Sequence, residues 1–247
     1  MSQGNHPIEV EDLVVGYGKK RVLTGASVKL PEGRTTVLLG RNAAGKTTLL
    51  RTLMGLLAPQ RGRSSVLGLD PMTQRNALCE QVGFVPDRPD VFPQMRLGEA
   101  ASMLALHHPR WEHPRFDAMV ARFGLDRTQR FGEFSKGQGM KAMIALALAI
   151  DPEVLLMDEP FGGLDPVARD EVLDEMLGAL GERQRTVLVS THETEIAARI
   201  GDHLVVLAAG RLGPVQDMET VLHAPSGPRG ADALGALLAA GVEGDVA

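Results

Sequence analysis

Runs of aliphatic and β-branched residues, separated by glycines and charged residues, dominate the first third of the chain. Runs of this length bounded by turn residues predict β-strands. They lie at residues 8–15, 22–30, 34–39, 64–67 and 81–85. Between the third and the fourth run the pattern changes, because leucines at positions 49, 50, 53 and 56 share one side of a helix and predict a helix over residues 47–57.

From residue 86 to about residue 149, apolar residues recur at helical intervals and predict a helical segment. A proline suits the first position of a helix, so we expect another helix to begin near Pro166. Strands that alternate with helices favour an α/β fold, with a mostly parallel sheet covered on both faces. Beyond about residue 216 the chain is rich in glycine and alanine, which predicts a weak helix and a frayed tail. Three apolar runs after the helical segment predict buried strands at 154–157, 186–189 and 204–207.

The composition is typical of a soluble globular protein, with 44% apolar and 23% charged residues among 247. The single cysteine, Cys79, excludes a disulfide within the chain and suits a reducing compartment. A net charge of -5 provides no overall field that would attract nucleic acid. The longest apolar stretches, 142–150 and 233–242, are shorter than the ~18 residues of a membrane-spanning helix. Residues 1–7 lack the apolar core of a signal peptide, so we expect a protein that neither crosses a membrane nor leaves the cytoplasm on its own.

The segment GRNAAGKT at residues 40–47 matches the phosphate-binding pattern G-x-x-x-x-G-K-[ST], between a predicted strand and a predicted helix. Backbone N–H groups of such a loop, together with the positive end of the helix, surround phosphate oxygens. Lys46 would reach the β- and γ-phosphates, and the Thr47 hydroxyl would bind Mg²⁺. The alternative is a glycine turn that opens a helix with an exposed lysine. The residues predicted to bind nucleotide in this P-loop are Gly40, Arg41, Asn42, Ala43, Ala44, Gly45, Lys46, Thr47 and Thr48.

Two adjacent carboxylates, Asp158 and Glu159, end the apolar run 154–157. Both therefore lie at the carboxyl edge of a predicted strand, where open α/β sheets bind their ligands. Asp158 suits a role at Mg²⁺, and Glu159 suits a general base or a group that positions water. A buried strand must also leave the core through polar residues, which would explain an isolated pair. Together with the P-loop, the pair favours the functional interpretation.

With these two elements, the chain resembles the nucleotide-binding subunit of an ATP-binding cassette (ABC) transporter over residues 8–213. Four further segments carry the resemblance. They are Phe134-Ser135-Lys136-Gly137-Gln138, similar to the family signature L-S-G-G-Q; Gly163-Leu164-Asp165, at the spacing of the D-loop; Ser190-Thr191-His192, similar to the segment with the switch histidine; and Tyr17 between two glycines, where the family places an aromatic that stacks on adenine.

The resemblance implies a P-loop NTPase fold: an α/β protein with a mostly parallel sheet flanked by helices, an N-terminal antiparallel β subdomain and a small helical subdomain. It implies a single ATPase domain. Its expected parts are a core from residues 1–86 and 151–215, a helical signature subdomain from 87–150 and a short tail from 216–247.

The resemblance also assigns roles to individual residues. Two chains would pair head to tail, and the signature residues of each, Ser135, Gly137 and Gln138, would close over the γ-phosphate held by the other. The implied catalytic residues are Glu159, His192 and Lys46, with Asp165 in the D-loop; the implied metal ligands are Thr47, Asp158 and Asp87.

Each of these residues also has a local explanation. Ser135 would cap a core helix whether or not two chains pair. A single histidine at a strand end is more often structural than catalytic, but the segment around His192 in a P-loop protein reverses that preference. Tyr17 could be a surface tyrosine in a turn. Stacking on a base is worth ~1–3 kcal/mol, which offers a purpose for a lone exposed aromatic beside a nucleotide site.

Three residues depart from the family pattern. Ala43 occupies a position where the family usually has glycine, and its Cβ would crowd a loop conformation that glycine tolerates more easily. Lys136 replaces a signature glycine, a form associated with one branch of exporters. Asp87 stands where the family normally supplies a glutamine to Mg²⁺ and the attacking water. Because it is shorter and negatively charged, Asp87 either binds the metal or fails to reach it.

We therefore expect an ATPase subunit, with ATP and Mg²⁺ as ligands, that drives a transporter whose integral membrane permease is a separate chain. A second ATPase subunit would complete the site, and a homodimer would have two competent sites. The protein would then be cytoplasmic and peripheral on the inner face of the cell membrane, bound through the permease. The region of Arg110, Trp111 and Phe116 and the short helical subdomain resemble bacterial exporters of the ABC-2, drug-resistance type, so we expect export.

The main alternative is a soluble ABC-type ATPase that acts on ribosomes or DNA. DNA-repair members insert a long coiled coil between P-loop and signature, and the span from Gly45 to Ser135 has no room for one. Translation-associated members usually carry two cassettes, and this chain has one. The negative net charge also disfavours a nucleic-acid partner. A P-loop kinase is disfavoured by the signature and by His192.

Overall fold

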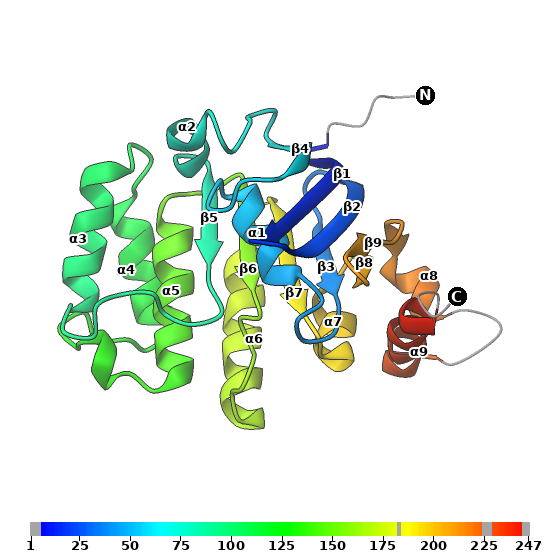
Figure 1. The fold of residues 1–247 in the computed structure, drawn as a ribbon. Coiled ribbons are helices and arrows are strands. Elements are labelled where there is room, and N and C mark those ends of the chain that lie inside the picture. Colours follow the sequence, from blue (N-terminus) through cyan, green and yellow to red (C-terminus); the bar gives the residue numbers. More distant parts are fainter. Residues whose placement is uncertain (1–5, 182–183, 224–228, 244–247) are drawn as a thin grey trace. The chain divides into compact units, whose positions relative to one another are not determined.

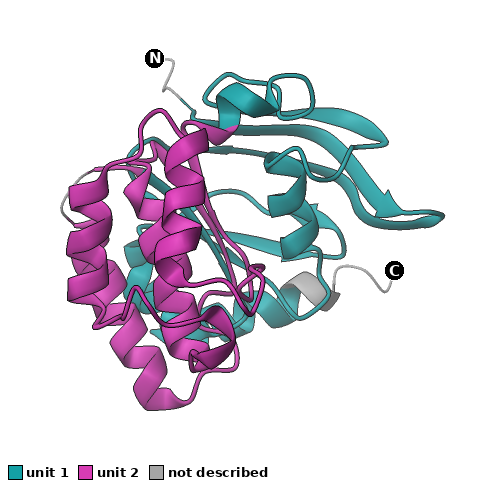
Figure 2. Cartoon of the chain, turned by 90° about the vertical axis from the view of Figure 1, so that its left-hand side faces the viewer, with its two compact units in different colours: residues 1–78, 186–247 teal, residues 79–185 magenta. Residues whose placement is uncertain are grey.

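A computed structural model describes residues 6–181, 184–223 and 229–243. The chain forms two compact units, unit 1 from Met1–Leu78 with Thr186–Ala247, and unit 2 from Cys79–Arg185 (Figure 2). These boundaries differ from the division at residues 86 and 150 expected from the sequence, because unit 2 includes the strands on either side of the helical segment. The expected functional division stays a prediction.

Unit 1 begins with an antiparallel sheet of three strands, β1 (Ile8–Tyr17), β2 (Lys20–Leu30) and β4 (Arg61–Val66), in the order β2-β1-β4 (Figure 1). Strands β1 and β2 form a hairpin in which Tyr17 pairs with Lys20 across a turn at Gly18, whose φ is +59°. Buried and more exposed residues alternate along β1, as expected of a sheet with one face on a core. The expected antiparallel β subdomain is confirmed.

The second sheet of unit 1 is mostly parallel. Strand β3 (Thr35–Leu39) pairs in parallel with β7 (Thr186–Thr191) on one side and with β8 (His203–Ala208) on the other. Two short strands, β9 (Arg211–Leu212) and β10 (Gln216–Asp217), pair with β8 in the antiparallel direction. Every residue of β7 is buried, which fits its continuous apolar run.

In the core of unit 1, a helix packs against both sheets. Helix α1 (Lys46–Leu53) directs Leu49 and Leu53 toward Ile8 of β1, Leu38 of β3 and their neighbours. Toward the C-terminus, α7 (Thr194–Ile200) contacts β3, and α9 (Ala231–Glu243) contacts α7, β8 and the short helix α8 (Met218–Leu222).

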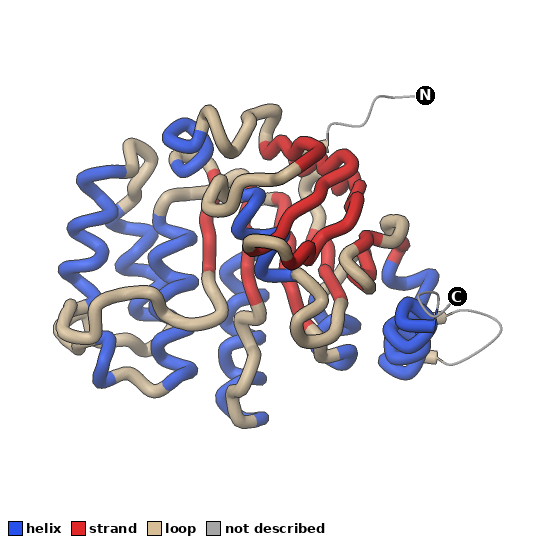
Figure 3. Tube along the Cα trace, viewed as in Figure 1, coloured by secondary structure: helices blue, strands red, loops and turns tan. Residues whose placement is uncertain are grey.

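Unit 2 contains one parallel strand pair, β5 (Val82–Val85) with β6 (Val154–Asp158). The chain between these strands forms no further strand (Figure 3). It comprises the helices α3 (Leu97–His107), α4 (His113–Arg122) and α5 (Lys136–Ala149), with a 3₁₀ turn at Phe131–Glu133. This confirms the helical segment predicted before residue 149. Helix α6 (Pro166–Leu180) follows β6 and begins at the predicted proline.

Helix α5 is the centre of unit 2, since 11 of its 14 residues are buried and it contacts α3, α4, α6 and β5. A helix that is buried around most of its circumference belongs in a core. Its contact with β5 requires Gly83, because a Cβ there would lie 2.9 Å from Leu155 Cδ1 and 3.0 Å from the Ala147 carbonyl oxygen.

Several elements differ from the prediction. Helix α1 ends at Leu53 rather than residue 57, because Gly55 adopts a left-handed backbone with φ +66°. Helices α2 (Arg75–Cys79) and α7 were not predicted, and neither were β9 and β10. The expected weak C-terminal helix is present as α9. The expected frayed tail includes residues 224–228 and 244–247, which lie outside the described residues.

Throughout the described ranges, no helix is both long enough and apolar enough to span a bilayer.

Candidate functional site

The P-loop joins β3 to α1 in unit 1. Gly45 caps α1 with φ +113°, and its carbonyl oxygen accepts the first helical hydrogen bond from the Leu49 N–H at 2.9 Å. No side chain caps this end of the helix. The first-turn N–H groups, which have no partner within a helix, therefore face the loop, as an anion site requires.

Lys46 is buried under the loop that it follows. Its side chain is bent back, so that its ammonium donates hydrogen bonds to the carbonyl oxygens of Gly40 at 2.6 Å and Arg41 at 3.1 Å. Only 5% of the residue is exposed. These bonds hold a positive charge against the first residues of the loop, where the phosphates are expected.

Ala43 adopts the left-handed conformation, with φ +64°. From the sequence we expected a loop conformation that glycine tolerates more easily than alanine, and a positive φ is such a conformation. For a residue with a Cβ, the left-handed region costs about 1–2 kcal/mol. Ala43 therefore adopts the left-handed conformation in this loop at the cost of local backbone strain.

His192 lies next to the start of the P-loop. In the parallel pair of β3 and β7, Leu39 is level with Thr191, and the Gly40 N–H donates to the Thr191 carbonyl oxygen at 3.1 Å. The exposed His192 follows directly, at the same sheet edge as the loop. Unit 1 therefore brings the P-loop and this histidine together.

A cavity of about 460 Å³ opens beside the P-loop within unit 1. Tyr17, 49% exposed, pairs in the hairpin with Lys20, which lines this cavity. Its walls are residues 20–22 and 24 of β2, residues 41–44 of the P-loop, the turn 207–210 after β8, and Leu238 of α9. Sequence reasoning missed the walls outside the P-loop. For the β2 wall, the basic residues Lys20 and Arg21 were the one local signal in the sequence.

In unit 2, three acidic residues lie at one edge of the β5–β6 pair. Val85 is level with Met157, the last paired residues on the two strands. Asp158 ends β6 with 1% exposure, and the half-buried Glu159 follows it. Asp87, which is exposed, follows Val85 at the same offset in sequence as Glu159 follows Met157, the residue that pairs with Val85. Asp87 therefore shares the carboxyl edge with the predicted acidic pair.

Glu159 has an unusual backbone. Its φ is +45°, and its carbonyl oxygen accepts a hydrogen bond from the Gly162 N–H at 2.9 Å. A glutamate in the left-handed region is uncommon, and such strain clusters at functional sites.

The signature segment begins α5. The Ser135 hydroxyl accepts a hydrogen bond from the Gln138 N–H at 3.2 Å, and the Gln138 side-chain oxygen accepts one from the Ser135 N–H at 3.0 Å. This is a reciprocal capping box. The expected capping role of Ser135 is confirmed, and Gln138 takes part in it.

The signature and the D-loop lie close together in unit 2. Asp165 caps α6 and accepts hydrogen bonds from the N–H groups of Val167 and Ala168, both at 3.1 Å. A Cβ on Gly137 would lie 3.5 Å from the Ala168 Cβ, and one on Gly163 would lie 2.5 Å from the Lys136 ammonium. The start of α5 therefore packs against the start of α6.

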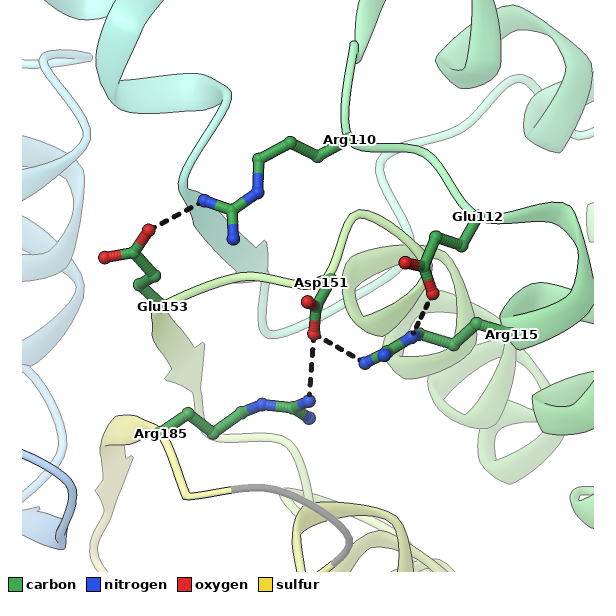
Figure 4. Close-up of polar contacts among 6 residues, drawn as sticks. All are labelled: Arg110, Glu112, Arg115, Asp151, Glu153 and Arg185. Atoms are coloured by element: carbon green, nitrogen blue, oxygen red, sulfur yellow. Dashed lines mark hydrogen bonds and ion pairs between the residues drawn. The ribbon is translucent and has the colours of Figure 1, made fainter.

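An ionic network, buried at Asp151 and Arg185, lies at the opposite end of β6, and the sequence carried no signal for it (Figure 4). Asp151 accepts hydrogen bonds from Arg115 at 2.6 Å and from Arg185 at 3.4 Å. Arg115 also pairs with Glu112 at 3.0 Å, and Arg110 with Glu153 at 2.7 Å. The network joins the start of α4 to the residues before β6, and thereby fixes the strand that ends in Asp158.

The predicted metal ligands have the chemistry that Mg²⁺ requires. Thr47, Asp158 and Asp87 all offer oxygen atoms, which Mg²⁺ prefers. The residues described contain no cluster of three or more His, Cys, Asp or Glu that could hold an ion by themselves. Mg²⁺ generally binds through one or two carboxylates together with the phosphates of a substrate.

Comparisons with known proteins give one family. The ABC transporter family model matches residues 23–162, more than half of the chain. The nickel import ATP-binding protein NikO of Rhodobacter capsulatus is 36% identical over 233 residues, covering 85% of this chain and 90% of that protein. The Nod factor export ATP-binding protein I of Rhizobium etli is 33% identical, covering 83% of this chain and 66% of that protein.

A solved structure described as an ATP-binding subunit of an ABC transporter is also similar. It is 29% identical and superposes with a TM-score of 0.77, covering 87% of this chain and 91% of that one. The P-loop, the capped helix α5 and the acidic end of β6 follow one another in this order along the chain. The chain belongs to the ABC transporter family and is an ATP-binding subunit with ATPase activity.

Proposed function

We propose that this chain binds Mg–ATP at its P-loop and hydrolyses it to drive a permease carried on a separate membrane chain. The observation that carries the proposal is the buried Lys46 ammonium, held at the mouth of a loop whose helix end is left without a side-chain cap. A positive charge and the N–H groups at the start of a helix, together in one small loop, suit a polyphosphate.

Residues of the P-loop, the end of β6 and the end of β7 would divide the steps of ATP hydrolysis among them. The P-loop N–H groups and Lys46 hold the phosphates and stabilise the charge that develops on them. Glu159 orients the attacking water and accepts its proton as the bond from the γ-phosphorus to ADP breaks. His192 lies at the P-loop edge, where it can contact the γ-phosphate. Thr47 and Asp158 would hold Mg²⁺, with Asp87 as a third ligand; the ion neutralises phosphate charge.

A second subunit completes the mechanism that we propose. The signature helix α5 already has its end capped by Ser135 and Gln138, and it would close over the nucleotide of a partner subunit in a head-to-tail dimer, which we propose to be a homodimer. ATP binding closes the pair and hydrolysis opens it. The permease would hold this dimer on the inner face of the cell membrane.

Export remains our proposal for the direction of transport, on the basis of Lys136 and the region of residues 110–116. The relatives do not favour either direction, since one is named for nickel import and another for Nod factor export. Detergent-solubilised membranes offer the test of the partner: the tagged chain should retain an integral membrane protein. Retention of ribosomes instead would favour the soluble alternative.

Replacing Glu159 with glutamine tests the catalytic assignment. We expect Glu159→Gln to bind ATP, to dimerise in its presence during gel filtration, and to hydrolyse it at least about a hundredfold more slowly. Lys46→Ala should lose ATP binding. Glu195→Gln, an exposed carboxylate on α7, is the matched control and should keep wild-type turnover. Near-wild-type turnover of Glu159→Gln would contradict the assignment.

A further inference from the structure

The cavity beside the P-loop has one wall from a distant part of the chain. One wall is the P-loop itself, and two more are β2 and the turn after β8, which both adjoin the loop. The fourth is Leu238, on the C-terminal helix α9 (Figure 1). All of these residues belong to unit 1.

Helix α9 is anchored firmly enough to present that side chain. Leu234 is fully buried and Ala233 is 8% exposed, and the helix contacts α7, α8 and β8. Leu238 lies one turn beyond Leu234 on the same helix face and is half-buried. The apolar stripe of α9 therefore runs from the core to the cavity.

The turn opposite α9 is also fixed in place. Ala209 and Gly210 both have positive φ and close the β8–β9 hairpin. The Gly210 carbonyl oxygen accepts a hydrogen bond from the Thr24 N–H at 2.9 Å. A Cβ on Gly210 would overlap the Val22 carbonyl group, so the turn can pack this closely on β2 only with glycine there.

The lining of the cavity combines two kinds of chemistry. Lys20, Arg21 and Arg41 carry positive charge, and within the described part of the chain none of them has a carboxylate partner. Val22, Leu207 and Leu238 supply apolar surface. A flat, apolar group attached to phosphates matches both features, and the volume lies in the range of ligand pockets.

We propose that Leu238 forms part of the wall that binds the base and ribose of ATP, so that helix α9 contributes to nucleotide affinity. This inference rests on the proposed function, since it needs ATP at the P-loop. Tyr17, paired with Lys20 at the rim of the same cavity, would stack on the base, and Leu238 would contact the nucleoside from the α9 side.

Titration calorimetry on the full chain tests the proposal, with Mg–ATP and with magnesium tripolyphosphate, which lacks the nucleoside. Leu238→Ala should raise the Kd for ATP by about three- to tenfold, because it removes part of an apolar contact. It should leave the Kd for tripolyphosphate unchanged. Leu237→Ala is the matched control, since Leu237 is also a half-buried leucine of α9 but does not line the cavity. Equal ATP affinity in wild type and Leu238→Ala, or an equal loss in both variants, would overturn the proposal.

A labelling experiment provides an independent readout. In a Cys79→Ser background, Leu238→Cys should react more slowly with a thiol reagent when Mg–ATP is bound, and tripolyphosphate should not protect it. Leu237→Cys in the same background should show no protection. If ATP binds and position 238 is not protected, α9 has no place at the nucleoside. If wild-type protein binds neither ATP nor tripolyphosphate, the proposed function itself fails.

Discussion

Asp151 is a buried charge that contributes to the stability of unit 2 through two arginines. Its side chain is 10% exposed and accepts hydrogen bonds from Arg115 and from Arg185, whose own side chain is 3% exposed. We choose Asp151→Asn as the perturbation. Asparagine keeps the shape and tolerates the left-handed backbone of this position, where φ is +48°, so the substitution isolates the loss of charge.

The magnitude follows from burial. Exposed ion pairs are worth about 0–1 kcal/mol, whereas removing one member of a buried pair costs about 3–5 kcal/mol because the remaining charge is left uncompensated. Asparagine retains a neutral hydrogen-bond acceptor, so we expect the lower value, about 3 kcal/mol. For a chain of this size that lowers Tm by about 6–12 °C.

Thermal unfolding followed by circular dichroism measures the effect. Glu11→Gln is the matched control, because it removes one carboxylate charge from the exposed pair that Glu11 forms with Arg63. It should change Tm by no more than about 4 °C. If Asp151→Asn were as stable as the control, the network would contribute no more than a surface pair, and our account of how β6 is held would be refuted.

Three further predictions concern other positions. Ala43→Gly removes left-handed strain of about 1–2 kcal/mol and should tighten ATP binding by no more than about thirtyfold, whereas Ala43→Val should weaken it; one Kd for all three proteins would contradict this. Asp87→Ala should raise the Mg²⁺ concentration needed for half-maximal ATPase activity, and the exposed Asp90→Ala should not; an unchanged titration would remove Asp87 from the metal site. Burial, reinforced by His107, lowers the pKa of His108, which disfavours its charged form in the folded protein. The unfolded chain therefore binds more protons as pH falls through the ordinary histidine range, so stability should fall there, and His108→Leu should make the fall smaller.

The sequence was sufficient for the parts of the fold that local patterns determine. Buried strands such as β7 are continuous apolar runs, and the P-loop lies between a strand and a helix that each carry their own periodicity. Helices α2 and α7 were missed because five and seven residues are too few to establish a helical period. Strands β9 and β10 have two residues each and depend on β8 for their existence.

For the candidate site, the sequence supplied individual residues but not their surroundings. Lys46 and Glu159 were named from the P-loop pattern and from the end of an apolar run, and Ser135 from the resemblance of its segment to the family signature; their roles stay predictions. The cavity wall at Leu238 and the network at Asp151 could not, since both arise where segments distant in sequence meet. The left-handed φ of Glu159 was equally hidden, because glutamate is not a residue that signals such a turn.

That backbone at Glu159 has a consequence for how the chain can be engineered. Asparagine or glycine would suit a φ of +45° better than glutamate by about 1 kcal/mol. A search for stabilising substitutions would therefore favour replacing this position, and under the catalytic role that we propose for Glu159 it would select proteins that fold more stably and hydrolyse ATP slowly. At this turn the proposed chemistry and the stability of the fold favour different side chains, because the backbone disfavours the glutamate that we propose as the catalytic group.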